Sequence, residues 1–229
     1  MRLAKILLYL IVGSYTFSAS GIVLSPTVLA MNIESNRFGQ VVVTNNSTQR
    51  LPLETIVLNL TFKDDGSYET YQVDDNPLNI FPPAAILAPG SKQIFRVQWS
   101  GKRLPSESKS YFVRFAELQL SDKDDDVVSK TATSTGVKVQ VNYNALIHVY
   151  ANTHQPDVVL IIDKTGEAVL INKGNRFTYS RLLQFDDLAS DKQSVLLGAI
   201  GEIFIPPNSS LDIFMDESLP AGEYHGQER

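Results

Sequence analysis

The sequence predicts an all-β protein that consists of two antiparallel β-sandwiches in tandem. Apolar and polar residues alternate with a period of two in many segments, and Gly, Pro, Asn and Asp turns separate these segments. One order of elements, a strand followed by a proline corner, occurs twice. No segment shows a convincing helical period, so packed sheets are the expected way to bury the apolar faces.

Residues 1–20 are typical of a cleavable export signal. Arg2 and Lys5 precede the apolar run ILLYLIVG, and Ser18-Ala19-Ser20 provides the small residues that a signal peptidase reads. The run is shorter than the roughly 20 residues that a membrane-spanning helix needs. We therefore expect a mature protein that begins near Gly21 and does not insert into the membrane after cleavage. An uncleaved anchor is the alternative.

The first sandwich contains four clearly alternating segments, at residues 56–62, 94–99, 111–116 and 137–143. In each of them apolar side chains recur at every second position, which is the period of a strand with one buried face. Asp64-Asp65-Gly66 follows the first segment and is typical of a turn between two strands.

The segment FPPAAILAPGSKQIFRVQW, at residues 81–99, reads as a stiff corner that leads into a strand. Pro82-Pro83 has fixed φ angles and no N–H donors, so it is unsuited to the interior of a central strand. Pro89-Gly90 predicts a turn, and Ser91 can bond to the local backbone. The alternation of residues 93–99 then predicts a strand that starts directly after the turn.

The chain contains a faint internal repeat. VVVTNNS at residues 41–47 resembles AVLINKG at 168–174, and in both an apolar strand ends at an asparagine. LAPGSKQIF at residues 87–95 resembles IPPNSSLDIF at 205–214, and in both a proline corner precedes a strand. The repeated order predicts two domains of the same architecture.

The boundary between the two domains is expected in the polar, proline-containing segment YANTHQPDV, residues 150–158. We therefore predict one domain over residues 21–149 and a second over 150–229. After Met215 only LPAGEYHG still resembles a strand. The second sandwich is therefore expected to be incomplete at its C-terminus and less stable than the first.

Composition and motifs argue against catalysis, metal binding and nucleic-acid binding. The formal charge is −5, from 20 basic and 25 acidic residues, so there is no basic excess. The absence of cysteine excludes disulfides and thiolate sites. His148, His154 and His225 lack metal-ligand spacing, and no nucleophile elbow, Walker loop or dinucleotide-binding glycine turn is present. We expect a protein that is not an enzyme and holds no metal or other cofactor.

What remains as a functional group is the backbone of a strand edge, which can pair with a strand of another chain. The alternating segment 137–143 follows the long polar segment SDKDDDVVSKTATSTG, residues 121–136. This arrangement suits a strand that is lent to a partner. An ordinary last strand of the first sandwich is the alternative that the pattern leaves open.

Several segments, taken in order, resemble the PapD-like periplasmic chaperones of the chaperone–usher pilus pathway. The matching segments are LSPTVLAMNI, VVVTNNSTQRLPLETIVL, NIFPPAAILAPGSKQIFRVQW, LPSESKSYFVRFAELQL and GVKVQVNYNALIHVYA. They cover nearly the whole first domain, and the second domain matches more weakly. The resemblance implies two immunoglobulin-like domains set at an angle and a periplasmic location.

The resemblance also implies a function and its partners. Chaperones of this family hold pilus subunits that lack their final strand until an outer-membrane usher takes them. They lend a strand to the groove of the subunit, and here Val137, Val139 and Val141 would be the lent side chains. Basic residues of the family bind the carboxylate at the C-terminus of the subunit. A pilus or surface-fibre subunit and an exported immunoglobulin-like adhesion module are the alternative functions.

The carboxylate-binding residues depart from the family pattern. The family usually has an arginine directly after the Pro-Thr pair, where this chain has Val28, and Gln140 aligns best with its usual lysine partner. Arg114, with Lys138 beside it, is therefore the substitute that we expect to bind the carboxylate. A solvated charge on a strand face is the alternative interpretation of Arg114.

Overall fold

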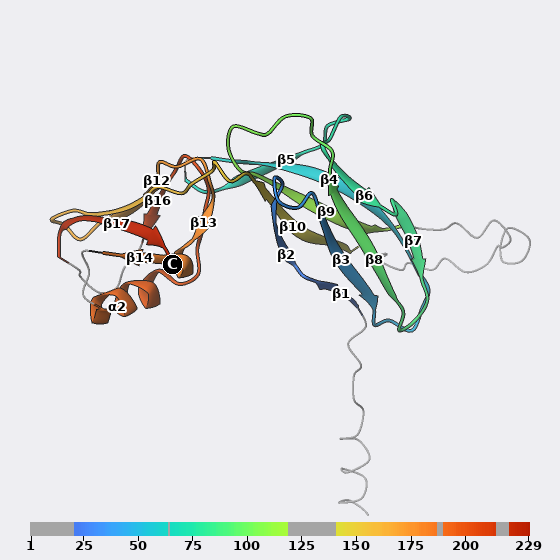
Figure 1. The fold of residues 1–229 in the computed structure, drawn as a ribbon. Helices are drawn as coiled ribbons and strands as arrows, with labels where there is room; N and C mark the ends of the chain where they lie inside the picture. Colours follow the sequence, from blue (N-terminus) through green and yellow to red (C-terminus); the bar gives the residue numbers. More distant parts are fainter. Residues whose placement is uncertain (1–20, 64, 119–140, 187–189, 214–219) are drawn as a thin grey trace, which may run out of the picture.

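The computed structural model describes residues 21–63, 65–118, 141–186, 190–213 and 220–229, so the expected export signal lies outside the described residues. The fold is all-β with two immunoglobulin-like domains, as predicted (Figure 1). Strands β1 to β10 form the first domain, and β11 to β17 with one helix form the second. Within the described residues, no helix is long and apolar enough to cross a membrane.

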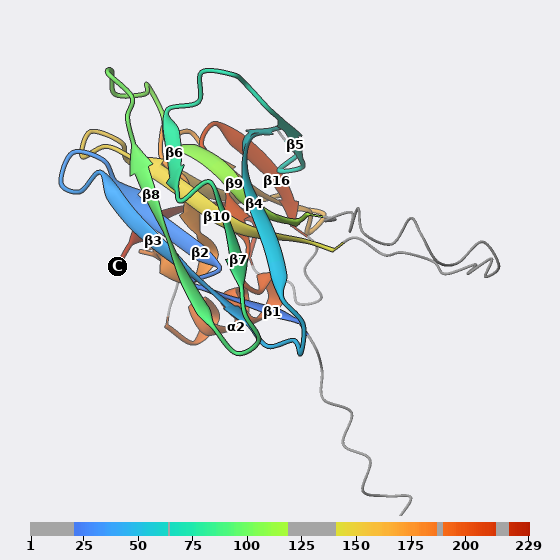
Figure 2. The ribbon, with the colours of Figure 1, turned by 90° about the vertical axis from the view of Figure 1, so that its right-hand side faces the viewer.

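The first domain is a sandwich of two sheets, which Figure 2 shows as two layers. Sheet A has the order β1 (Ile22–Ser25), β3 (Phe38–Asn45), β8 (Lys92–Trp99) and β6 (Leu78–Phe81). Sheet B has the order β2 (Val28–Asn32), β10 (Asn142–Tyr150), β9 (Lys109–Glu117), β4 (Leu51–Phe62) and β5 (Tyr68–Tyr71), and β7 (Ala84–Leu87) also pairs with β4.

The core of the first domain follows the predicted alternation. Its fully buried side chains come from every second position of facing strands, among them Val41, Val43, Phe95, Val97, Val113, Phe115, Ile147 and Val149. The rings of Phe95 and Phe115 meet edge to face across the two sheets, with centroids 4.9 Å apart. On β4, however, Leu58 and Leu60 are also buried although they lie on the opposite face from Leu53 at its start. On that second face Phe62 of β4 contacts Phe204 of the second domain, with ring centroids 5.0 Å apart.

The proline corner carries the chain from one sheet to the other. Strand β6 ends at Phe81 in sheet A, and β7 begins at Ala84 in sheet B. Between them Pro83 accepts hydrogen bonds from Thr55 N, at 2.8 Å, and from Thr55 Oγ1, at 3.0 Å. Gly90 has a φ of +72° in the following turn, a conformation that favours glycine. The sequence-based corner is therefore confirmed, and its role is to change sheets.

The internal repeat corresponds to a buried asparagine in each domain. Asn45 Nδ2 donates to the backbone oxygens of Leu87 and Ala88, at 3.1 and 3.2 Å, and so holds the Pro89-Gly90 turn between β7 and β8. Asn172 Nδ2 donates to Pro206 O at 2.9 Å in the second domain. Both asparagines are fully buried at the end of a strand. The repeated strand-then-corner order thus reflects one hydrogen-bonding device used twice.

The second domain has a five-stranded sheet, sheet C, with a helix and a short ribbon against it. Sheet C has the order β14 (Leu183–Phe185), β17 (Gly222–Glu228), β11 (Val158–Ile162), β12 (Ala168–Asn172) and β16 (Ser209–Ile213). The ribbon pairs β13 (Thr178–Tyr179) with β15 (Phe204–Ile205), a 3-10 turn spans Ser180–Leu182, and the helix α2 spans Ser190–Ile200. The chain between β10 and β11 spans residues 151–157, and the boundary at 149/150 stays a prediction.

Two expectations for the second domain are wrong. The helix α2 was not expected, because its buried positions Gln193, Leu196 and Ile200 span only two turns and one of them is polar. The sheet was expected to be incomplete at its C-terminus, yet the segment GEYHG, which resembles a strand in the sequence, belongs to β17, and β17 lies inside sheet C between β11 and β14. Its strand signal is weak because Tyr224 is its only buried side chain and its pairing depends on the backbone.

The two domains meet around His148, which is fully buried on β10. Its Nδ1 shares a hydrogen bond with Ser110 Oγ of β9 at 2.7 Å, and its Nε2 shares one with Tyr179 OH of the second domain at 3.0 Å. The imidazole stacks on Phe177 and Phe204, with centroids 4.2 and 5.0 Å away. These contacts fix the second domain against the outer face of sheet B, so the histidine is structural, as expected.

Burial lowers the pKa of His148 to about 3, whereas an unfolded histidine has a pKa near 6.5. The unfolded chain therefore binds the proton more readily, and the stability contributed by neutral His148 is full above pH 6.5 and is lost as pH falls towards 3. Between pH 7.5 and pH 5.0 we expect a loss of about 2 kcal/mol in the free energy of unfolding, measured by urea denaturation. His148→Phe should remove this pH dependence. An equal loss in that variant would place the titrating group elsewhere.

The interior position of β17 gives a second prediction. Deleting residues 219–229 should leave β11 and β14 without a partner between them and expose the core that Tyr224 covers. Amide hydrogen exchange in Val158–Ile162 should then become fast, while deletion of Arg229 alone should leave it slow. Unchanged protection of β11 in the longer deletion would contradict this role of β17.

Candidate functional site

The open edge of β10 is the candidate site. Strand β2 runs parallel to β10, but it pairs only from Leu146 onward, where Leu146 N donates to Thr27 O at 2.8 Å. The chain before Thr27 belongs to β1, which pairs with β3 in the other sheet. Within the described residues, Asn142–Ala145 therefore pair with β9 alone. Their other edge presents backbone N–H and C=O groups that another strand can bind.

The side chains on the inward face of β10 become more exposed towards the N-terminal end of the strand. Ile147 and Val149 are fully buried in the core, and so is Ala145. Tyr143 is only partly buried, and Val141 is 42% exposed. A series of apolar side chains thus runs out of the core at the point where the backbone edge is also open. This is the arrangement that strand addition requires, with backbone for pairing and alternate side chains for a groove.

The sequence-predicted donor residues fall mostly before this edge. Val137 and Val139 lie outside the described residues, and so does Lys138. Val141 is described and lies directly before β10, at the exposed end of its inward face.

Arg114 lies on the outer face of sheet B. Its neighbours Val113 and Phe115 are buried in the core, so its side chain points the other way. Its Nε donates to Asn144 Oδ1 at 3.3 Å, across the pair of strands that contains the open edge. The second domain contacts the same face at His148, which binds Tyr179 OH and pairs with Ser110, four residues and roughly 13 Å from Arg114 along β9. Arg114 thus faces the side on which the domains meet.

Val28, which takes the place of the family's usual arginine, pairs with Leu146 of β10. Both of these positions carry apolar side chains, so neither supplies a cation for a carboxylate. Gln140, which aligns best with the usual lysine, lies outside the described residues, so that alignment stays a prediction.

A cavity of about 540 Å³, here called the cleft cavity, lies beside Val28 between the two domains. Residues 24–28 line it from the first domain, and Tyr179, Arg181 and Glu202 line it from the second. The guanidinium of Arg181 lies over the Tyr179 ring, 5.1 Å from its centroid, and is ion-paired with Glu202. Sequence reasoning missed Arg181, since nothing in its local pattern indicates that it faces the first domain.

Comparisons with known proteins identify solved structures that have a similar fold. No protein-family model matches the chain, and no curated protein matches it. Among solved structures, the class 5 fimbriae chaperone CfaA is 14% identical with a TM-score of 0.58, and the match covers 91% of this chain and 99% of that chain.

Two structures of complexes are also similar. One is the CsuC–CsuE chaperone–tip adhesion subunit pre-assembly complex of Acinetobacter baumannii, with 14% identity, a TM-score of 0.53 and coverage of 86% and 92%. The other is the Salmonella enterica SafA pilin in complex with the SafB chaperone, with 10% identity, a TM-score of 0.52 and coverage of 92% and 97%. The chain therefore shares, over most of its length, the two-domain fold of these proteins.

Proposed function

We propose that this protein is a periplasmic chaperone that captures pilus subunits by lending them a strand and passes them to an outer-membrane usher. The observation that carries the proposal is the open edge of β10 at Asn142–Ala145, within a fold shared with pilus chaperones. A subunit that lacks a strand exposes apolar core and unpaired backbone groups, both of which favour aggregation in water. The edge of β10 supplies what such a subunit lacks.

The lent segment has two parts in this proposal. The backbone of Asn142–Ala145 and of the residues before it extends the sheet of the subunit. The side chains of Val137, Val139 and Val141 enter the groove of the subunit, since they continue the parity of the inward face of β10. The pairing of β10 with β9, and the contacts of its His148 with the second domain, keep the edge in place before a subunit arrives.

Arg114 is the proposed anchor for the C-terminal carboxylate of the subunit, with Lys138 as a second cation. Its guanidinium is held by Asn144 on the strand that carries the open edge, and it is only partly buried. A charge-assisted hydrogen bond of this kind contributes about 1.5–3 kcal/mol. Arg181 in the cleft cavity is the competing position, and its ion pair with Glu202 must be exchanged before it binds a carboxylate.

The lent strand is tested by a charged and an apolar substitution at one position. Val139→Glu should abolish recovery of the cognate subunit from periplasm, because it places an unpaired charge in an apolar groove. Val139→Ile keeps the side chain apolar and should leave recovery near the wild-type level. Both chaperones should have wild-type circular dichroism. Full recovery by a folded Val139→Glu protein would exclude lending of this segment.

The anchor is tested by removing single cations. Arg114→Ala should weaken binding of purified subunit by roughly ten- to a hundredfold, as expected for one charge-assisted contact. Arg96→Ala is the matched control, since Arg96 is exposed on the outer face of sheet A. If Arg181→Ala weakens binding and Arg114→Ala does not, the carboxylate is bound in the cleft cavity instead.

A further inference from the structure

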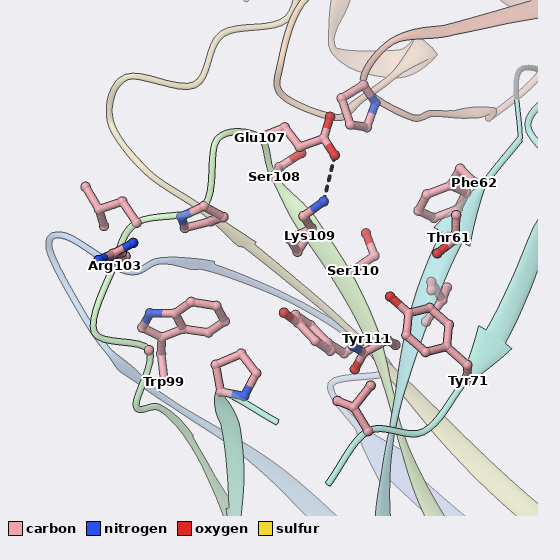
Figure 3. Close-up of a pocket in the computed structure, with 18 of the residues that line it drawn as sticks. Thr61, Phe62, Tyr71, Trp99, Arg103, Glu107, Ser108, Lys109, Ser110 and Tyr111 are labelled. Carbon is pink, nitrogen blue, oxygen red and sulfur yellow. Dashed lines mark hydrogen bonds and ion pairs between the residues drawn. The ribbon is translucent and has the colours of Figure 1, made fainter. Parts of the chain in front are cut away.

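A second cavity, of about 620 Å³ and here called the aromatic pocket, lies between the first domain and the turn at Pro207-Asn208 of the second (Figure 3). Strands β4 and β9 and the connection between β8 and β9 form its walls. It shares no lining residue with the cleft cavity and contains neither Arg114 nor Val141. Its volume is that of a small-molecule site, and such sites are frequent where domains meet.

Aromatic rings enclose the pocket. Trp99 and Tyr111 are each only 4% exposed, and their ring centroids are 6.4 Å apart. Tyr71 stands opposite them and is 49% exposed, so a ligand can reach its ring (Figure 3). A side chain at Gly101 would approach the Trp99 ring to 2.6 Å, so only glycine lets the β8–β9 connection lie this close to the indole.

Several polar groups of the pocket can donate a hydrogen bond but have no side-chain partner. Within the described residues, the hydroxyls of Tyr71 and Tyr111 and the guanidinium of Arg103 make no side-chain hydrogen bond, and Trp99 Nε1 is buried without a partner. Burial, together with the nearby Tyr71, raises the pKa of Tyr111 to about 12, so its hydroxyl keeps its proton at neutral pH. Such groups favour a ligand that is rich in acceptors.

The charged groups of the pocket also favour a ligand that accepts hydrogen bonds. Lys109 Nζ binds Glu107 Oε1 at 2.7 Å, and Asn208 Nδ2 donates to Glu107 Oε2 at 2.9 Å. Both oxygens of the Glu107 carboxylate therefore already accept a hydrogen bond. The Lys109 ammonium has three protons and can still donate to a ligand. Asp75 also lines the pocket, but its side chain is exposed. Figure 3 shows the ammonium of Lys109 directed at Glu107, with Ser110 and then Tyr111 next along β9. The hydroxyl of Ser110 shares a hydrogen bond with His148.

We propose that the aromatic pocket binds a small aromatic carboxylate. The ring of the ligand packs against Tyr71, and its carboxylate accepts hydrogen bonds from Lys109 and from the tyrosine hydroxyls, with Arg103 at the side of the pocket. This binding site is separate from strand lending and does not depend on it. Because Pro207 and Asn208 line the pocket, a bound ligand also contacts the second domain.

The chain contains a single tryptophan, and it lines this pocket, so its fluorescence reports binding directly. The intact protein is titrated with sodium benzoate and, in parallel, with benzamide as the neutral analogue. We expect a saturable change of tryptophan emission with benzoate and at least tenfold weaker binding of benzamide. Saturation-transfer NMR on both compounds provides a second readout that does not use the tryptophan.

Variants locate the binding. Lys109→Met should weaken benzoate binding at least tenfold, and Tyr71→Phe should weaken it severalfold, while both remain folded because these side chains are substantially exposed. Lys92→Met, on an exposed position of β8, is the matched control and should bind like the wild type. The proposal is overturned if benzoate gives neither a saturable change nor saturation transfer, if benzamide binds equally well, or if Lys109→Met binds like the control.

Discussion

The structure depends on one constraint in the path of the N-terminal strand. A single chain segment serves both sheets of the first domain, as β1 in sheet A and β2 in sheet B, so it meets β10 only from Leu146 onward. The preceding backbone of β10 is left with one partner, β9. Unpaired backbone groups on a strand edge have to bind water or another strand. In the proposed function, the unpaired groups of β10 bind a strand of another chain.

Other features keep this edge in position. The proline corner between β6 and β7 links the two sheets, and buried Asn45 fixes the backbone at the next turn, where β7 ends before Pro89. At the far end of β10, His148 packs against two rings of the second domain. The strand is thus rigid where it joins the second domain and open where it leaves the core. A pre-organised edge loses less conformational entropy when it pairs with a partner.

Much of the first domain could be predicted from the sequence, because its strands have one buried face and alternate accordingly. Less of the second domain could be predicted from the sequence. Strand β17 has only Tyr224 as a buried side chain, so its membership of sheet C follows from backbone pairing that no side-chain pattern records. Val28 and Leu146 meet through a parallel pairing between distant segments, and their register could not be read from either segment. Arg181 reaches the cleft cavity only through the domain arrangement.

The most direct test of strand lending is amide hydrogen exchange along β10, measured with and without a bound subunit. In the free protein, amides of Asn142–Ala145 that point to the open edge should exchange quickly, and those bonded to β9 should exchange slowly. A subunit that adds its strand to this edge should protect the fast amides and leave the slow ones unchanged. If a stable complex forms while the open-edge amides still exchange quickly, the subunit binds elsewhere and the account is wrong.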